Sequence, residues 1–177
     1  MNLSKRRGQI WVETVIYTLI GLAIIGIVLS VAQPKINAKK DEVVIDQSIE
    51  ALGNIDDKIS SVVGSSPGNT RIIDLVVGKG EVVIDMDNEA IIWKLDSRVK
   101  YSQENIEIEL GKIKVKTVQD GGEWDVTLRL DYNYDLQFEG QNSGTKPFFK
   151  AATPYKLTVE NDGLNPNDGK IIIMFRE

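Results

Sequence analysis

Residues 5–33 read KRRGQIWVETVIYTLIGLAIIGIVLSVAQ, and this segment sets the architecture that the rest of the 177-residue chain must fit. It opens on a basic run and then carries no charged residue across 14–32. A helix of that length, rising about 1.5 Å per residue, nearly covers the ~30 Å hydrocarbon layer of a bilayer. We therefore expect one membrane-spanning helix over residues 9–33, with a cytoplasmic amino terminus because basic flanks favour that side.

Glu13 is the exception at the start of this apolar segment. A carboxylate in a membrane helix costs a few kcal/mol unless it lies near the interface or has a partner. One interpretation places Glu13 at headgroup depth. The other supplies a cation, since cleavage between Gly8 and Gln9 would give Gln9 a free α-amine and make Glu13 the fifth residue of the product.

The order of these residues resembles the processing site of type IV pilins, and the form KRRGQIWVE over residues 5–13 looks most like the archaeal branch of that family. The resemblance covers about residues 4–33, and Gln9 departs from the Phe that is typical of bacterial pilins. It implies that a membrane prepilin peptidase removes a leader, residues 1–8, and leaves the apolar helix on the protein. The residues implied in leader recognition and cleavage are Lys5, Arg6, Arg7, Gly8 and Gln9.

Two other interpretations of the amino terminus stay open. A conventional secretory signal could end at Ser30-Val31-Ala32 and leave Gln33 first, although its apolar core would be longer than usual. An uncleaved single-pass anchor would keep the whole segment. The mature amino terminus separates the three: Gln9, Gln33, or residue 1 or 2.

Small and hydroxyl side chains recur within the predicted span. Thr14, Thr18 and Gly21 lie within about 60° of one another on a helical wheel, and Gly26 belongs to a second small-residue face. Such residues let helices approach closely. Together with Glu13, these four residues are the predicted assembly contacts.

Pro34 follows the span and is expected to kink or interrupt the helix, because proline lacks a backbone N–H. Beyond it, apolar residues from Ile45 to Val62 recur at steps of three and four, which predicts an amphipathic helix over about 36–63 laid on a sheet. A loop at 64–69 ends it, so residues 34–68 form a helix-and-loop segment ahead of an extracytoplasmic β domain, 69–177.

From Arg71 onward the apolar period becomes two, which indicates β-strands. The expected strands are 72–77, 81–85, 90–95, 105–110, 112–118, 124–131, 155–160 and 170–175. Gly78-Lys79-Gly80 predicts a hairpin between the first two, Asn161-Asp162-Gly163 and Asn167-Asp168-Gly169 lie between the last two, and 140–146 reads as a polar loop. The predicted fold class is α+β: a long amino-terminal helix followed by an all-antiparallel, sandwich-like β domain.

The composition excludes several kinds of chemistry. The chain has no Cys and no His, so thiol nucleophiles, Ser–His pairs, imidazole zinc sites and disulfides are ruled out. A net charge of −5 argues against a nucleic-acid surface. Residues 85–89 and 161–169 offer oxygen ligands as calcium loops do, but strand-joining turns explain them better. We predict no catalytic, metal or cofactor site, and no enzyme activity.

The favoured function is therefore a structural subunit, major or minor, of a type IV pilus-like surface filament, assembled through its apolar helix after leader cleavage. The resemblance implies four kinds of partner: the prepilin peptidase, other pilin subunits, a membrane assembly machinery, and membrane lipid before assembly. The alternative is a single-pass membrane-anchored binding or adhesion module with its β domain outside the cell.

Overall fold

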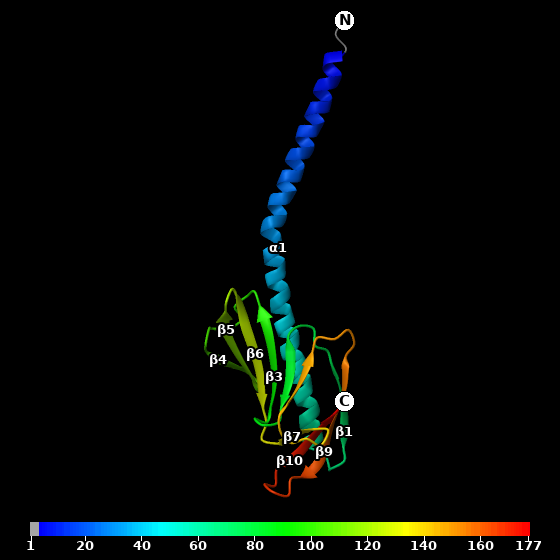
Figure 1. Ribbon diagram of the computed structural model, residues 1–177, viewed down its shortest axis with the longest axis vertical. Coiled ribbons are helices and arrows are strands. Elements are labelled where there is room, and N and C mark those ends of the chain that lie inside the picture. The colour runs from blue at the N-terminus through cyan, green and yellow to red at the C-terminus, as the bar shows by residue number, and fades with distance from the viewer. Residues whose placement is uncertain (1–3) are drawn as a thin grey trace. The chain divides into compact units, whose positions relative to one another are not determined.

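The computed structural model describes the backbone of residues 4–177 and the side chains from Trp11 onward. One α-helix, α1 (Ser4–Val63), is followed by ten strands (Figure 1). The chain divides into two compact parts, which are described separately: a helical unit, residues 1–40, and a globular unit, residues 41–177. The strands are β1 (Thr70–Leu75), β2 (Glu81–Asp85), β3 (Ala90–Ser97), β4 (Glu107–Leu110), β5 (Ile113–Asp120), β6 (Glu123–Asp131), β7 (Asp135–Phe138), β8 (Thr145–Phe149), β9 (Tyr155–Leu164) and β10 (Ile171–Arg176).

Helix α1 continues through Pro34. Proline removes one hydrogen bond from the helical ladder, but the residues before and after it keep theirs, so a helix can continue past it. The expectation that Pro34 interrupts the helix is therefore wrong, and the predicted span and amphipathic helix are parts of one 60-residue element. A kink at Pro34 stays a prediction.

The strands of the globular unit form two sheets. One has the order β1-β9-β10-β7, and the other has the order β4-β5-β6-β3-β2-β8. The antiparallel pairs β2–β3, β4–β5, β5–β6 and β9–β10 join consecutive strands. The α+β class, with one long helix ahead of a two-sheet β domain, is confirmed.

The predicted hairpin at Gly78-Lys79-Gly80 is wrong. β1 pairs with β9, whereas β2 pairs with β3 and β8, so this linker carries the chain from one sheet to the other. The indole Nε1 of Trp93 donates to the Lys79 carbonyl oxygen at 3.0 Å, which holds the linker against β3. Gly80 is required there, because its φ is 74° and an added Cβ would lie 1.9 Å from the Lys94 carbonyl oxygen.

The sequence predicted an all-antiparallel β domain, and this is wrong for one pair of strands. β7 pairs in parallel with β10, and both β7 and β8 were missed. β8 begins at Thr145, so it takes in part of the predicted loop 140–146. β7 could not be recognised from alternating apolar and polar residues, because three of its four residues are buried and burial does not alternate along the strand.

Asn161 does not lie in a turn between the last two strands, because β9 continues to Leu164. Its side chain is buried and closes the carboxyl end of α1 instead. Asn161 Nδ2 donates to the carbonyl oxygens of Ser65 at 3.1 Å and Val62 at 3.4 Å, and Asn161 Oδ1 accepts from the Gly163 N–H at 3.0 Å. The helix end thus gains donors for carbonyl groups that have no partner within the helix.

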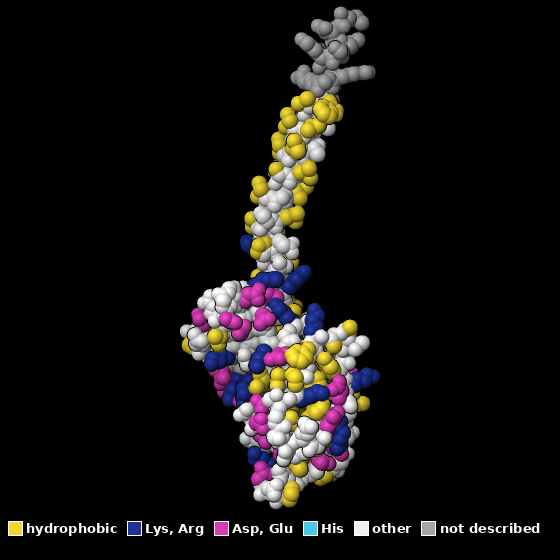
Figure 2. All heavy atoms as spheres, viewed as in Figure 1, with side chains coloured by type: hydrophobic (Ala, Val, Ile, Leu, Met, Phe, Trp, Pro, Cys, Tyr) yellow, Lys and Arg dark blue, Asp and Glu magenta, His cyan; other side chains and the backbone are white. Residues whose placement is uncertain are grey.

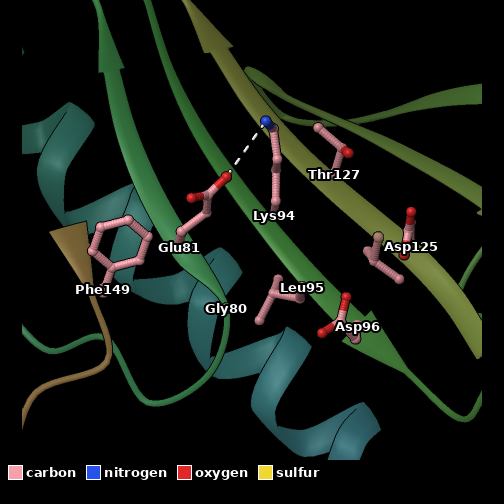
Figure 3. Close-up of a pocket in the computed structure, with 9 residues that line it drawn as sticks. Gly80, Glu81, Lys94, Leu95, Asp96, Asp125, Thr127 and Phe149 are labelled. Atoms are coloured by element: carbon pink, nitrogen blue, oxygen red, sulfur yellow. Dashed lines mark ion pairs between the residues drawn. The ribbon is translucent and has the colours of Figure 1, made fainter. Parts of the chain in front are cut away.

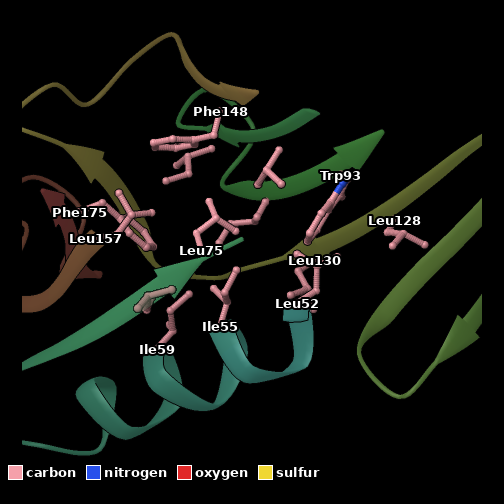
Figure 4. Packing of buried hydrophobic residues seen from close by; sticks show 14 of the residues in the cluster. Leu52, Ile55, Ile59, Leu75, Trp93, Leu128, Leu130, Phe148, Leu157 and Phe175 are labelled. Atoms are coloured by element: carbon pink, nitrogen blue, oxygen red, sulfur yellow. The ribbon is translucent and has the colours of Figure 1, made fainter. Parts of the chain in front are cut away.

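The core of the globular unit is a single cluster that α1 shares with both sheets. The predicted apolar stripe is buried at Ile45, Leu52, Ile55, Ile59 and Val62. Figure 4 shows the helix residues of this stripe beside Leu75 of one sheet and Trp93 and Leu130 of the other. Burial of each large side chain contributes about 1.5–3 kcal/mol, so this part of the helix belongs to the β domain energetically.

We expect a chain that begins at Ile36 to fold alone into a soluble, β-rich monomer, because the part of α1 that packs on the sheets remains in it. Circular dichroism and sedimentation measure the two properties. A spectrum dominated by helix, or aggregation of the purified chain, would contradict the assignment of 41–177 as a self-sufficient unit.

Candidate functional site

The first candidate site is the apolar part of α1, residues 11–31. The exposed fraction of its large apolar side chains runs from 37% for Val15 to 71% for Trp11. These positions follow one another almost without a break, so they lie on all sides of the helix. Figure 2 shows those on the visible face. Among the described residues, α1 is the one helix long and apolar enough to cross a membrane, with a mean hydropathy of 2.6 in its most apolar part. Apolar surface of this extent is normally covered by lipid or by other protein.

Glu13 has a partner that the sequence analysis missed. The Tyr17 hydroxyl, one helical turn further on, donates to Glu13 Oε1 at 3.4 Å. The signal was present, since residues four apart face each other on a helix. Tyr17 thus gives the carboxylate one hydrogen bond, but no positive charge.

The predicted assembly residues lie on two faces of this helix. The Thr18 hydroxyl donates to the Thr14 carbonyl oxygen at 2.8 Å, so its polar group is turned to the helix's own backbone. A Cβ added at Gly21 or Gly26 would meet no atom within 4 Å, so both positions are open to a neighbouring helix. Gly26 lies about a third of a turn round the helix from Thr14, whereas Thr18 and Gly21 lie close to Thr14.

The predicted leader and cleavage residues fall where side chains are not described. Lys5, Arg6, Arg7, Gly8 and Gln9 lie in the first turns of α1, and their side chains are outside the described residues. Cleavage between Gly8 and Gln9 stays a prediction.

The second candidate feature is a set of polar contacts that fix α1 to the six-stranded sheet and its loops. Asp41 is buried, and it accepts from Lys79 Nζ at 2.7 Å and from the Arg98 backbone N–H at 3.0 Å. Burial alone would raise the pKa of Asp41, but the hydrogen bonds from Lys79 and Arg98 outweigh it and hold the pKa below its ordinary value. This contact joins the helix to the β1–β2 linker and to the residue after β3.

Two further contacts continue this attachment along the helix. The Tyr101 hydroxyl donates to Asp46 Oδ1 at 2.9 Å, and burial together with this carboxylate raises the pKa of Tyr101 to about 12. Lys112 Nζ donates to Asp56 Oδ2 at 2.7 Å. Sequence reasoning missed all three contacts, because the partners are separated by 38 residues or more and follow no local pattern.

In the acidic turn at 85–89, carboxylate oxygen atoms accept hydrogen bonds from backbone N–H groups of the same chain. Asp85 Oδ1 accepts the backbone N–H groups of Asp87 and Asn88, at 3.2 and 3.1 Å. Glu89 Oε2 accepts the Leu136 N–H at 2.7 Å, and burial raises the pKa of Glu89. These bonds support the turn interpretation over calcium. Within the described residues, no group of three or more His, Cys, Asp or Glu side chains could hold a metal ion.

Of the segment 161–169, residues 161–164 belong to β9, and the turn interpretation holds for residues 165–169. There Asn165 Oδ1 accepts the Asn167 N–H at 2.9 Å, and Asp168 Oδ1 accepts the Lys170 N–H at 3.1 Å. Both side chains thus stabilise the local turn between β9 and β10.

An open hollow of about 370 Å³ lies on the six-stranded sheet beside β8 (Figure 3). Lys94 and Glu81 form an ion pair across it at 3.4 Å, and the exposed Phe149 stands at one end. Asp125 and Asp96 face each other on neighbouring strands, and burial together with Asp120 and Asp96 raises the pKa of Asp125. The hollow combines an aromatic ring with charges of both signs.

The described residues therefore offer two principal features. One is an uncovered apolar helix that carries Glu13 and Tyr17. The other, within the globular unit, is the set of polar contacts that Asp41, Asp46 and Asp56 of α1 make with the β domain. Compared with known proteins, the chain matches no family model, no curated protein and no solved structure.

The attachment at Asp41 predicts a pH-dependent stability. The pKa of Asp41 is lowered in the folded state, so its contribution is present above the unfolded-state pKa, about 4, and is lost as the pH falls through the folded-state value. Asp41→Asn should therefore lower the free energy of unfolding at pH 7 by about 1–2 kcal/mol, the lower part of the usual range because Lys79 is about one-third exposed.

Urea unfolding of the chain that begins at Ile36, at pH 7 and pH 3, measures this difference. At pH 3 the gap between wild type and Asp41→Asn should shrink. Asp57→Asn, at an exposed position of the same helix, is the control and should change stability by less than about 0.5 kcal/mol. An equal effect of Asp41→Asn at both pH values would contradict the ion-pair explanation.

Proposed function

We propose that this chain is a structural subunit of a type IV pilus-like surface filament, assembled through the amino-terminal part of α1 after removal of a leader. The observation that carries the proposal is the uncovered apolar surface of residues 11–31 with a carboxylate, Glu13, at its start. Before assembly, lipid covers this surface; in the filament, the same helices of neighbouring subunits cover it.

Glu13 is the feature that favours a filament over a plain anchor. Lipid covers apolar side chains as well as protein does, but it offers a carboxylate no cation within its hydrocarbon layer. Tyr17 supplies one hydrogen bond without charge, at 3.4 Å. In the proposed filament, the α-amine released at Gln9 of one subunit pairs with Glu13 of an adjacent subunit, among apolar helices where either charge alone would be strongly unfavourable.

The faces of the apolar helix also suit packing against copies of itself. Thr18 turns its hydroxyl to the backbone, and Gly21 leaves open space beside it. A neighbouring helix would therefore meet a smooth surface on which close approach leaves no polar group unsatisfied. Gly26, on another face, provides a second place for such an approach.

The proposed arrangement gives each unit a location. The amino terminus lies in the cytoplasm until the prepilin peptidase cuts it, the apolar helix spans the membrane, and the globular unit lies outside the cell. Within the globular unit, Asp41, Asp46 and Asp56 bind the later part of α1 to the β domain. The assembly machinery and other pilin subunits are the remaining partners.

The alternative is a membrane-anchored binding module, and one observation favours it. The hollow beside Phe149 is open and combines an aromatic ring with charged groups, as ligand-binding surfaces do. That function needs neither leader cleavage nor Glu13, so the following two experiments separate it from a filament subunit.

We expect the mature protein to begin at Gln9. Removal of residues 1–8 takes away three positive charges and no negative ones, so the net charge changes from −5 to −8. Intact-mass measurement of the protein purified from membranes or filaments tests this. Gly8→Val should block processing, since a small residue precedes the cut in this family, whereas Gly26→Val should not. A mature chain that starts at Gln33, or one that keeps its leader, would remove the proposal.

Glu13→Ala should leave processing and folding of the β domain intact but reduce filament yield about tenfold or more, because the new amine would remain without its partner among apolar helices. Filament yield is scored against the amount of processed protein in the membrane. Glu50→Ala, at an exposed position in the globular part of α1, serves as the control and should assemble normally. Normal filaments from Glu13→Ala cells would leave the anchored binding module as the better explanation.

A further inference from the structure

β1 is an edge strand with an uncovered apolar side. It pairs with β9 along one edge, and no described strand pairs with its other edge. Ile72 is 66% exposed and Val76, directly after the strand, is 58% exposed. A groove of about 280 Å³ lies between β1 and α1, lined by Ala51, Asn54 and Lys58 of the helix and by residues 72–76. Exposed apolar edges of this kind are templates for pairing with another chain.

Two of the other sheet edges, β8 and β7, carry features that discourage such pairing. β8 contains Pro147, which has no N–H to donate. At the end of β7, Phe138 exchanges backbone hydrogen bonds with Gln141, so the following turn folds back on the strand. β1 has no proline, and Ile72 and Val76 stand on either side of its one acidic residue, Asp74.

The edge at β4 complements the groove at β1 in charge and in apolar surface. Glu107 and Glu109 are exposed, and Ile106 and Leu110, at the two ends of the strand, are 45% and 40% exposed. The groove is lined mostly by apolar residues and carries one exposed cation, Lys58, on its helix side and one exposed carboxylate, Asp74, on β1. A strand with apolar ends therefore matches the apolar lining, and its Glu107 and Glu109 find their opposite charge on the helix side, at Lys58.

The two edges lie on opposite sides of the globular unit. Figure 1 shows β4 at the left margin of the β domain and β1 at its right margin. When two different patches of one protein bind each other, the contact is heterologous, and its repetition produces an open chain of subunits rather than a closed dimer. This is the kind of contact that a filament needs.

We propose that the β4 edge of one copy of this chain packs into the β1–α1 groove of the next copy in the assembled filament. The inference rests on the proposed function. Two short strands bury less surface than the ~1,000 Å² of a stable interface, so the isolated globular unit remains a monomer. Within the filament, the packed apolar helices hold the domains at a high effective concentration, at which a weak contact forms.

Chemical cross-linking tests this contact without background, because the natural chain has no cysteine. Filaments of a variant with both Ile72→Cys and Leu110→Cys are treated with a short bifunctional maleimide and analysed by denaturing electrophoresis. We expect a ladder of covalent dimers, trimers and larger multimers. Each single variant should remain monomeric, since a heterologous contact brings the two different positions together.

The matched control combines Leu110→Cys with Leu164→Cys, because Leu164 is as exposed as Ile72, at 66%, but lies at the end of β9. Filaments that form normally but give no ladder with the Ile72 pair, or equal ladders with both pairs, would overturn the contact and leave the proposed function standing. An absence of filaments from wild-type cells would remove the proposed function, and the inference with it.

A charge reversal gives a second, independent measurement. Lys58→Glu in the cross-linking variant should weaken the ladder severalfold, and adding Glu109→Lys should restore it. A ladder that does not respond to Lys58→Glu would overturn the role assigned to charge complementarity, whereas rescue by the double reversal would support the pairing of these two edges.

Discussion

The globular unit depends on contact between one stripe of α1 and the inner faces of two sheets. Among the described residues no ladder joins the two sheets, yet their buried residues form one cluster with the helix residues between Ile45 and Val62. The sheets also touch directly, because the ring of Phe148 on one sheet contacts Phe138 and Tyr155 on the other. The linker at Gly78-Lys79-Gly80 changes sheets, and Trp93 binds its carbonyl while packing in the same core. Without the helix, the parts of both sheets that it covers would expose apolar side chains to water.

The same helix meets two different environments along its length. Residues 11–31 are apolar on every side, so their cover must come from outside the chain. From Asp41 onward, the apolar side chains narrow to a stripe, and carboxylates on the rest of the helix bind Lys79, Tyr101 and Lys112. The first part of α1 therefore needs lipid or other proteins to cover its apolar side chains, whereas the later part buries its apolar stripe within the chain's own fold.

Local patterns predicted the local structure. Alternation located eight of the ten strands, and the helix stripe and the apolar span were both recognised. The errors concern contacts between residues that are far apart in the sequence. Residues 78–80 have the composition of a hairpin turn, but β1 pairs with β9 and not with β2. The role of Asn161 depended on helix carbonyls 96 and 99 residues away. In the candidate site, Glu13 was predicted from its unfavourable surroundings, whereas Tyr17 was overlooked despite its helical spacing.

The hydrogen bonds from Asn161 also set the order in which a newly made chain can become complete. The carbonyl groups at the end of α1 wait for Asn161, which follows 96 to 99 residues later, and β1 waits for its partner β9, whose paired residues follow 80 to 90 residues later. Until the ribosome has released that segment, the nascent helix has its apolar stripe but neither its cap nor a finished sheet to lie on. The domain therefore cannot close until β9 has been made, so its completion comes late relative to the synthesis of α1 and β1.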